Sequence, residues 1–509
     1  MSDTGKSPIP PEEDLKLSSL IRNYVSLIGL AMAIVALVNF VFLFVVDVFS
    51  SRPSPYVGIL AYMVVPGFLI LGLALVPIGI LRERRARRQH VPSIPKFPRI
   101  DLNSPAHRSS VAFVLSFVIL FVVLSAVGSY RGYEYTDSTQ FCGQLCHSVM
   151  DPEFIAHQQS PHARVRCVDC HVGEGAGWYV RSKLSGARQV FKTIFNTYPR
   201  PIETPVANLR PAPETCEQCH WPKKFWGAQL RVVNTFGTDE KNTPRQLQLL
   251  IKTGGGDPSL GMAAGIHWHM NIGHQIDYRS DVKRQAISYV RLLDRATGKV
   301  TEYYAAGADP SKVADLSQKR MDCVDCHNRP THIYMAPDRS VDAALLAHRI
   351  DPTLPFAKAQ GVEVLSAPYK TTDEAMQAIA SKIPAFYREK YPEIAGARAR
   401  DVQQMVTELQ AIFKRSIFPE MKVDWRTHPD NIGHFYFNGC FRCHDGSHTS
   451  KDGKTITKDC NVCHTMLAQK EGDAPVEGSA MGVSFKHPID LGDMTAVNCS
   501  DCHGAQAAQ

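Results

Sequence analysis

Three long runs of uncharged, apolar residues mark the N-terminal part of the 509-residue chain, over residues 24–46, 56–81 and 111–127. The first two are long enough for a helix that crosses a lipid bilayer, and the third is at the short limit unless uncharged residues to Tyr130 extend it. A buried core helix is the alternative for one run. Three in succession, each bounded by charged or proline-rich segments, instead predict transmembrane helices. Residues 1–130 are therefore expected to form a membrane anchor, and no signal-peptide cleavage site follows the first run.

Beyond residue 130 the hydrophobic pattern consists of shorter segments of two kinds. Strand character, with a turn signal at Ala296-Thr297-Gly298, is found in residues 229–233, 246–252 and 287–304. Apolar residues at three- and four-residue spacing predict helices over residues 343–347, 372–390 and 398–414. Residues 336–420 are thus expected to form a helical connector, which serves either as a spacer or as a binding surface.

Basic residues are distributed unevenly around the three apolar runs. The loop after the first run has Arg52, whereas the loop after the second has eight basic residues: Arg82, Arg84, Arg85, Arg87, Arg88, Lys96, Arg99 and Arg108. By the positive-inside rule the second loop and the N-terminus are expected in the cytoplasm, and everything after Tyr130 outside. A basic run can also bind nucleic acid. Its place directly after a span favours contact with anionic membrane lipid, so no nucleic-acid partner is predicted.

All fourteen cysteines occur in seven motifs in which a histidine directly follows the second cysteine; one motif, Cys142/Cys146/His147, has three residues between its cysteines. The other six have the form C-x-x-C-H: Cys167/Cys170/His171, Cys216/Cys219/His220, Cys323/Cys326/His327, Cys440/Cys443/His444, Cys460/Cys463/His464 and Cys499/Cys502/His503. Zinc sites would need cysteines in groups of four, and thioredoxin-like pairs would not repeat the histidine. The spacing instead lets two thiols bond the vinyl groups of one haem while the histidine ligates its iron. The sequence therefore predicts seven covalently attached c-type haems.

The motifs are unevenly spaced along the chain. Their first cysteines are separated by 25, 49, 107, 117, 20 and 39 residues, which excludes a solenoid of one repeat. Covalent haem attachment takes place on the outer face of the bacterial inner membrane, in agreement with the predicted topology. The expected fold is a membrane-anchored multihaem c-type cytochrome, with three transmembrane helices followed by a mainly α, haem-cored periplasmic region with a small β-containing insertion.

Each haem iron has a sixth position, which a second side chain fills or which stays open for a substrate. Beyond residue 130, eleven histidines lie outside the motifs, enough for nearly complete ligation by two histidines. The candidates for this distal position are His162, His267, His269, His332, His434, His448 and His487. Alternation along a strand would place His267 and His269 on one face. The alternative for each is a surface or propionate-pairing histidine.

Met150 stands three residues after His147 and is a candidate sixth ligand of the first haem. Methionine ligation raises the reduction potential relative to two histidines. Packing of Met150 against the porphyrin is the alternative. The first motif begins only about a dozen residues after Tyr130, so its haem is expected at the membrane surface, where a lipid-soluble electron carrier would be met.

An apolar span, a first motif with a nearby methionine, the sequence Ser160-Pro161-His162, a C-x-x-C-H motif and the helix-like segment 178–191 resemble the NapC/NirT family of membrane quinol dehydrogenases. The resemblance covers about residues 111–335. It implies a tetrahaem module over 131–335 with an insertion at about 225–320, followed, after the connector, by a trihaem module over 421–509.

The same resemblance implies a quinol site beside the first haem, where Lys183 occupies the place of a family lysine. A lipid-facing or propionate-pairing lysine is the alternative. The family's acidic residue has no counterpart, because the matching positions are Gln189 and Val190. The three-residue gap of the first motif and the position of Met150, one place later than in the family, are further departures.

As a whole, the chain resembles the inner-membrane heptahaem cytochromes of metal-respiring bacteria. This implies a quinol dehydrogenase that passes electrons from the membrane quinone pool to soluble periplasmic c-type cytochromes in anaerobic or extracellular respiration, alone or in a complex with other respiratory subunits. A passive relay or anchor subunit is one alternative. A terminal reductase for nitrite or a similar molecule is the other, but no C-x-x-C-K motif occurs. The formal charge of +7 indicates no partner, since each haem adds two propionates.

Overall fold

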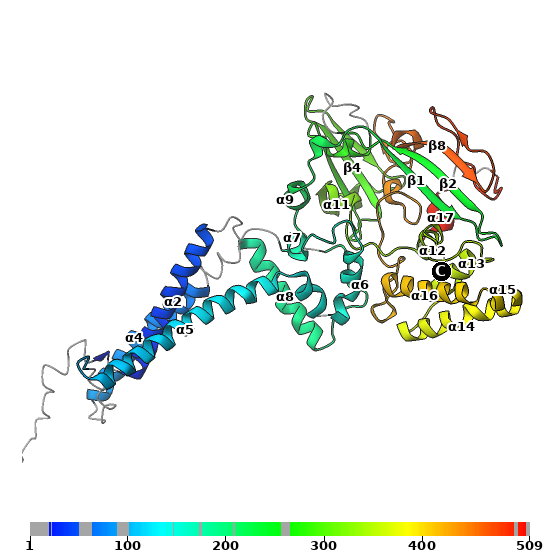
Figure 1. The fold of residues 1–509 in the computed structure, drawn as a ribbon. Helices are drawn as coiled ribbons and strands as arrows, with labels where there is room; N and C mark the ends of the chain where they lie inside the picture. Colours follow the sequence, from blue (N-terminus) through cyan, green and yellow to red (C-terminus); the bar gives the residue numbers. More distant parts are fainter. Residues whose placement is uncertain are drawn as a thin grey trace, which may run out of the picture. The chain divides into compact units, whose positions relative to one another are not determined.

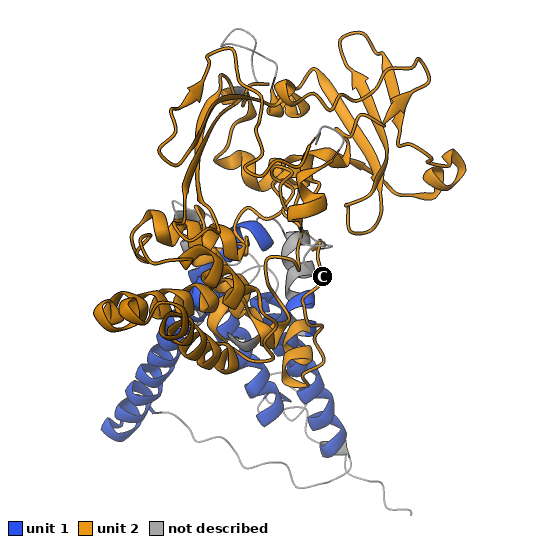
Figure 2. Cartoon of the chain, turned by 90° about the vertical axis from the view of Figure 1, so that its right-hand side faces the viewer, with its two compact units in different colours: residues 1–142, 167–188 blue, residues 143–166, 189–509 orange. Residues whose placement is uncertain are grey.

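The structure is a computed structural model that describes residues 20–21, 23–49, 64–88, 101–145, 147–172, 176–206, 209–255, 265–492 and 497–504. It divides into two compact units, which are considered separately below (Figure 2). Unit 1 comprises residues 1–142 and 167–188, and unit 2 comprises residues 143–166 and 189–509.

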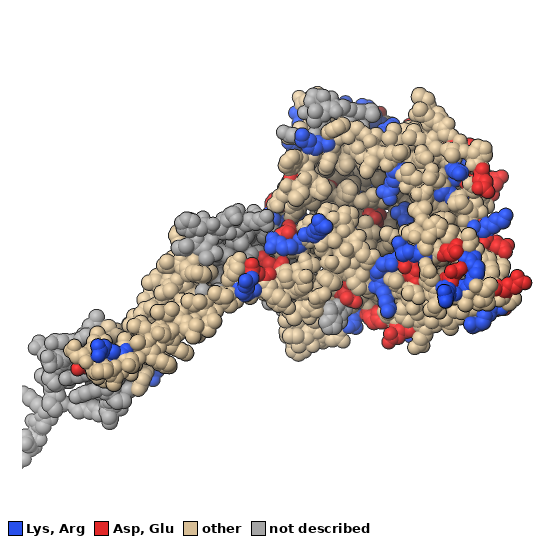
Figure 3. All heavy atoms as spheres, viewed as in Figure 1, with Lys and Arg blue, Asp and Glu red and all other residues tan. Residues whose placement is uncertain are grey.

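Unit 1 is built on long apolar helices: α2 (Tyr24–Phe49), α4 (Val65–Arg88) and α5 (Pro105–Thr136). Among the described residues, these three helices are long and apolar enough to cross a membrane. They confirm the helices predicted from the three apolar runs, although residues 56–63 of the second run lie outside the described residues. On the face drawn in Figure 3, charged atoms are sparse along these helices.

Small residues allow α2 and α4 to pack closely. A Cβ added to Gly29 would lie 2.7 Å from the carbonyl oxygen of Gly72, and one added to Gly72 would lie 2.7 Å from the backbone nitrogen of Ala33. The Ser26 hydroxyl also donates a 2.9 Å hydrogen bond to the carbonyl oxygen of Val76. Close backbone approach and interhelical hydrogen bonds are the main sources of helix association in lipid, so the two helices form a stable pair there.

Unit 2 contains two antiparallel sheets (Figure 1). The first has the strand order β1-β2-β8-β9, with β1 Gln229–Phe236, β2 Pro244–Ile251, β8 His464–Glu471 and β9 Glu477–Gly478. The second has the order β6-β3-β4-β5-β7, with β6 Gln318–Arg320, β3 His274–Ser280, β4 Ile287–Asp294, β5 Val300–Tyr304 and β7 Thr449–Ser450.

The strands predicted over residues 229–233, 246–252 and 287–304 are confirmed, and Gly298 at φ +70° occupies the turn between β4 and β5. The expectation of one small β-containing insertion is too narrow, however. Strands β7, β8 and β9 come from the C-terminal part of the chain: β7 pairs with β5, β8 pairs with β2, and β9 pairs with β8. An exposed strand edge is satisfied by adding another strand, so the C-terminal segment completes both sheets.

The connector forms a helical layer in unit 2. Its elements are α12 (Pro337–Leu346), α13 (Ala357–Ser366), α14 (Thr372–Lys390), α15 (Pro392–Ala397) and α16 (Ala399–Ser416). The helices predicted over 343–347, 372–390 and 398–414 are thereby confirmed. Their apolar faces enclose a core that includes Leu345, Ile379, Leu409 and Phe413, all fully buried.

The remaining helices of the described residues lie at the motifs and between the larger elements. They are η3 Phe141–Leu145, α6 His147–Gln158, α7 Cys167–His171, α8 Ala176–Ile194, α9 Ala212–Thr215, η4 Cys216–Gln218, η5 Pro222–Lys224, η7 Ile266–Met270, α10 Pro310–Asp315, α11 Cys323–Cys326, η8 Pro419–Met421, η9 Gly439–Arg442, η10 Cys460–Val462 and α17 Cys499–His503.

Candidate functional site

The C-x-x-C-H motifs lie on single helical turns, which explains how they present their side chains. The backbone N–H of His220 donates to the carbonyl oxygen of Cys216 at 2.8 Å, and His327 does the same to Cys323 at 2.8 Å. In a helical turn, residues three apart project from the same side, so both sulfurs of a motif point together. In a protein with haem attached, each of these cysteine sulfurs would form a thioether bond to the haem. The thiol sulfurs of the structure represent those thioether sulfurs.

The described motif cysteines differ in exposure. Cys170, Cys219, Cys326, Cys460 and Cys502 are exposed, and the others are partly buried. Attachment of a haem to these cysteines stays a prediction.

Five motif histidines of unit 2 each face a histidine from outside the motifs. The distances between ring centroids are 6.0 Å for His220 and His162, 6.4 Å for His327 and His267, 5.8 Å for His444 and His269, 6.3 Å for His464 and His434, and 6.1 Å for His503 and His487. The sequence predicted each of these five histidines as a distal ligand, but it did not predict which motif histidine each one faces.

The spacing of the paired rings fits one iron atom between two imidazoles. A metal–nitrogen bond is about 2.0 Å long, and the ring centre lies roughly 1 Å beyond that nitrogen, so two imidazoles on one iron have centres about 6 Å apart. The observed 5.8–6.4 Å agrees with this value. The donor sets of these five motifs therefore fit c-type haem ligated by two histidines.

Hydrogen bonds on the second ring nitrogen support the same interpretation. The Nδ1–H groups of the distal candidates donate to backbone carbonyl oxygens: His162 to Pro330 at 3.2 Å, His267 to Thr253 at 2.8 Å, His269 to Ile266 at 2.8 Å and His487 to Ile489 at 2.9 Å. A donor bond at Nδ1 fixes the tautomer in which Nε2 carries the lone pair for a metal. The fourth pair differs, because the Nδ1 atoms of His434 and His464 have no hydrogen-bond partner among the described residues.

His267 and His269 lie on the 3₁₀-helix η7, not on the strand that the sequence predicted. A 3₁₀-helix has about three residues per turn, so side chains two positions apart point in different directions. This is why the two histidines face different motif histidines, His327 and His444. Gly255, at φ +134°, lies against this helix, and a Cβ there would be 2.1 Å from the backbone carbon of His267.

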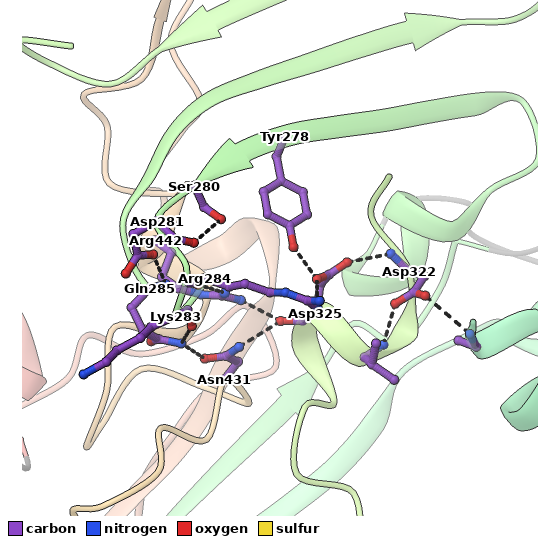
Figure 4. Close-up of polar contacts among 12 residues, drawn as sticks. Tyr278, Ser280, Asp281, Lys283, Arg284, Gln285, Asp322, Asp325, Asn431 and Arg442 are labelled. Atoms are coloured by element: carbon purple, nitrogen blue, oxygen red, sulfur yellow. Dashed lines mark hydrogen bonds and ion pairs between the residues drawn. The ribbon is translucent and has the colours of Figure 1, made fainter. Parts of the chain in front are cut away.

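A buried polar cluster ties the motif at Cys323 to the motif at Cys440 (Figure 4). The Asp325 carboxylate accepts hydrogen bonds from the Tyr278 hydroxyl at 2.5 Å and from the backbone N–H of Asp322 at 2.8 Å. Burial, reinforced by the negative charge of Asp325, raises the pKa of the Tyr278 hydroxyl. The carbonyl oxygen of Asp325 accepts from Arg442 at 2.7 Å and from Asn431 at 2.9 Å. Since Asp325 and Arg442 lie inside their motifs, the cluster fixes the two motifs relative to each other.

The five motifs whose histidines form these pairs lie next to one another in space, in the same order as along the chain. Burial raises the pKa of the half-buried thiols of Cys323 and Cys463 to about 11 and of Cys443 to about 12, and it also raises the pKa of Cys499. In each case a thiol of the preceding motif adds to the increase: Cys216 for Cys323, Cys326 for Cys443, Cys440 for Cys463, and Cys460 for Cys499. Such an influence is short-ranged, so each motif lies beside the next.

The first motif and its surroundings are only partly described. Cys146 lies outside the described residues, as do the side chains of His147 and Lys183, although Lys183 lies within α8. Met150, on α6, packs against an apolar cluster of unit 2 that includes Tyr334.

His332 and Glu153 lie beside the same cluster. The Nδ1–H of His332 donates to the carbonyl oxygen of Glu153 at 3.1 Å, the same arrangement as in the paired histidines. Burial raises the pKa of the Glu153 carboxyl group, and the hydroxyl of Tyr334 donates to this group at 3.1 Å. His171, on α7, is the histidine of the second motif.

His448 was selected from the sequence because it follows a motif, but both of its ring nitrogens are engaged. Nδ1 lies 3.0 Å from the Asp445 carboxylate, and Nε2 donates to the carbonyl oxygen of Ile287 at 2.9 Å. The ring is 1% exposed and joins β4 to the loop before β7. This arrangement leaves no nitrogen for an iron, so we replace the metal-ligand hypothesis for His448 with a structural role.

The sequence did not reveal Asp325, Tyr278 or Arg442 as residues of the site. Asp325 and Arg442 occupy the variable positions of their motifs, where any residue satisfies the pattern. For Asp325, the capping box with Asp322 is the signal that could have marked it, since Asp–x–x–Asp at the start of a helical turn satisfies two backbone donors.

Comparison with known proteins agrees with this geometry. Residues 104–204 match the N-terminal region of the NapC/NirT cytochrome c family. Over 497 residues, the chain is 46% identical to the cytochrome c-type protein ImcH of Geobacter sulfurreducens, covering 97% of both chains. The chain belongs to the ImcH family of c-type cytochromes. The resemblance inferred from the motifs is thus confirmed, although the family model matches a shorter segment than residues 111–335.

More distant relatives share only part of the chain. The cytochrome c nitrite reductase subunit NrfH of Nitratidesulfovibrio vulgaris is 32% identical over 122 residues, which are 23% of this chain and 71% of NrfH. The cytochrome c-type protein TorC of Escherichia coli is 29% identical over 234 residues, which are 42% of this chain and 56% of TorC. No solved structure matches the chain. Multihaem electron transfer is therefore the common feature of the family, and the three apolar helices fit anchoring in the inner membrane.

Proposed function

We propose that this protein is a quinol-oxidising, inner-membrane heptahaem cytochrome c that passes electrons from the quinone pool to periplasmic c-type cytochromes. The observation that carries the proposal is the set of five facing histidine pairs, in a chain whose NapC/NirT region begins at the third apolar helix. Menaquinol or ubiquinol would be the substrate. Residues 131–509 would lie in the periplasm and the N-terminus in the cytoplasm, because the C-terminal end of α4 and the residues between it and the third apolar run carry the basic residues.

In this proposal the fourteen motif cysteines hold seven haems covalently and the motif histidines are the proximal ligands. The five facing histidines are the distal ligands of their pairs. His332, held through Nδ1 by Glu153, is a further distal ligand, and Met150 is the distal ligand of the first haem. When bound, the haems supply one-electron redox centres whose order follows that of the motifs from Cys216 to Cys499.

Two features of the chain's own residues favour electron transfer over reduction of a small molecule. Ligation by two histidines leaves no open position for nitrite or a similar substrate. Backbone carbonyl oxygens hold His162, His267, His269 and His487 through Nδ1, so these rings are fixed as ligands and not poised to leave. We therefore favour an electron conduit over a terminal reductase.

For quinol oxidation, we propose that Lys183 donates a hydrogen bond to a quinol oxygen and takes part in release of its proton. A lysine amine is suited to both tasks, since partial burial lowers its pKa toward neutrality. The role follows from the match of Lys183 to the family lysine and from its place on α8. Protons would leave to the periplasmic side.

Quinol oxidation by the purified protein in lipid vesicles tests the proposal. We expect reduction of the haems by menaquinol or ubiquinol without any other subunit. Lys183→Ala should slow this reduction about ten- to a thousandfold, the range for one positioning or acid–base group, with unchanged haem content and unchanged reduction by dithionite. Lys192→Ala, on the same helix, is the matched control and should retain the rate.

The outcomes of this experiment separate the alternatives. No quinol oxidation by the wild-type protein, together with full reduction by dithionite, would identify a passive relay or anchor subunit. An unchanged rate in Lys183→Ala would place the quinol site elsewhere, with the first two apolar helices as the next region to test.

A further inference from the structure

The C-terminal part of the chain is acidic, in contrast to the chain as a whole. Residues 471–503 contain one basic residue, Lys486, and six acidic residues: Glu471, Asp473, Glu477, Asp490, Asp493 and Asp501. The formal charge of the complete chain is +7. Lys486 is paired with Glu477 at 2.8 Å and Glu471 with Arg245 at 2.8 Å, so Asp473, Asp490, Asp493 and Asp501 supply the excess of negative charge. We name the described residues 471–492 and 497–503 the acidic face.

The acidic face surrounds the last histidine pair, His487 and His503. The ring of Phe485 lies 6.2 Å from that of His487. The backbone N–H of Ile489 lies 3.2 Å from Nδ1 of His487, and the carbonyl oxygen of the same residue accepts from this nitrogen at 2.9 Å. Two hydrogen bonds between Gln469 and the backbone of Lys486 hold the segment on β8. The acidic face thus holds His487 in place, while Phe435 stacks on His503 at 4.8 Å from outside the face.

Large apolar side chains are exposed on this face. The exposed fraction of Met481 is 92%, and Val476 is exposed as well. Exposed apolar groups among like charges are typical of a surface that meets a partner, since apolar contact provides the centre of an interface and charges provide its rim.

We propose that the acidic face is the docking surface for a soluble, lysine-rich c-type cytochrome, which takes electrons at the last motif. This rests on the proposed function, in which electrons leave the protein, and on the order of the motifs along the chain, which ends at Cys499 within the acidic face. In each transfer one electron leaves this protein and reduces one ferric iron of the partner, with no bond formed or broken. The charge of the face selects a basic partner, and its small apolar area suits a short-lived complex.

Binding between fully oxidised proteins tests the proposal without any electron transfer. The probe is mitochondrial cytochrome c, a lysine-rich protein, and the matched control probe is the same protein with its lysines acetylated, which removes their charge. We expect binding of the unmodified probe that weakens at least tenfold when ionic strength rises from about 10 to 200 mM. The acetylated probe should not bind detectably.

Variants then locate the binding site. Asp473→Asn with Asp490→Asn should weaken binding about three- to tenfold, because two negative charges near the partner are lost. Glu389→Gln with Glu393→Gln, on the exposed side of α14 and α15, is the control of equal charge change and should leave binding unchanged. Met481→Ser should weaken binding about threefold, whereas Val282→Ser, at a site that is 90% exposed outside the face, should not.

Two results would overturn the proposal. One is equal binding of the acetylated and unmodified probes. The other is an equal loss of binding in the face variants and their controls. Neither result depends on quinol, so a protein that fails to oxidise quinol can still pass this test. A protein that oxidises quinol can equally fail it.

Discussion

The connector and the motif-bearing part of unit 2 differ in what their cores are made of. In the connector, eighteen buried apolar residues form one continuous cluster, from Val341 to Phe413. Around the motifs, the described clusters comprise six and four buried residues. A cluster of four to six side chains is far below what a domain of this size needs for stability. The contrast indicates that protein supplies the core of the connector, whereas the haems would supply most of the core around the motifs.

Removal of one haem should give the largest effect and tests this contrast directly. In Cys440→Ser with Cys443→Ser, no thiol remains to hold the haem of that motif, and the Asp325–Arg442 cluster loses its packing partner. We expect an intact mass that lacks one haem, and cleavage around residues 265–336 and 419–503 that is faster by about ten- to a hundredfold. Residues 337–416 should remain resistant. Limited proteolysis with mass spectrometry measures both, and equal cleavage of the connector would contradict the comparison.

A substitution that moves η7 should come next in size. In Gly255→Ala, the new Cβ would overlap the backbone of His267, and alanine is strained at φ +134°. We expect the variant to retain all its haems covalently, but two of its irons should lose a histidine and become high-spin, as seen by electron paramagnetic resonance. Gly298→Ala is the control, because it also has positive φ but no atom within 4 Å of the new Cβ. High-spin signal in both variants would show that strain alone, not displacement of η7, is responsible.

Truncation in the connector core should destabilise the connector without touching the haems. Leu409 is fully buried, and Leu409→Ala should lower the free energy of unfolding by about 2–5 kcal/mol. Leu346, which is 52% exposed, provides the control Leu346→Ala. Thermal unfolding followed by far-ultraviolet circular dichroism should show the loss, while the Soret spectrum of the native protein stays unchanged. An altered haem spectrum in Leu409→Ala would mean that the two cores are not independent.

The smallest expected effect concerns pH at the border between the two regions. Burial, followed by the positive charge of Arg329, lowers the pKa of His428 from 6.5 to about 4. Between these values the unfolded chain binds a proton that the folded protein does not, so stability falls as pH decreases from about 6.5 to 4. At pH 5 this amounts to about 2 kcal/mol. His428→Gln should flatten this part of the pH dependence of thermal unfolding, and an unchanged profile would assign the effect to other groups.

The sequence predicted the connector well and the sheets incompletely, for a physical reason. The helices α14 and α16 show apolar residues at helical spacing because they bury them against protein. Strands β7 and β9 are two residues long, and β8 starts at His464 inside a motif, so no alternation was available to predict them. Strands β8 and β7 pair with β2 and β5, which lie far away in the sequence, and β9 then pairs with β8.

The candidate site was also predicted in part. His162, His434 and His487 were predicted as ligands because they lie near a motif in the sequence, and all three face a motif histidine. Proximity also selected His448, but Asp445 and the carbonyl oxygen of Ile287 occupy its nitrogens, and no sequence rule indicates this. Pairing itself could not be predicted, because His267 and His269 are two residues apart yet face motifs at Cys323 and Cys440.

The order of the paired histidines along the chain has a consequence for how such a protein is made. In all five pairs, the histidine from outside the motif precedes its motif in the sequence. In the proposed topology, a chain that emerges across the membrane with its N-terminal side first would present the second imidazole before the cysteines arrive. When a haem is attached, both proposed axial partners would already be on the same side of the membrane. Each of these five centres would then close during translocation, and none would have to remain open until a downstream segment is synthesised.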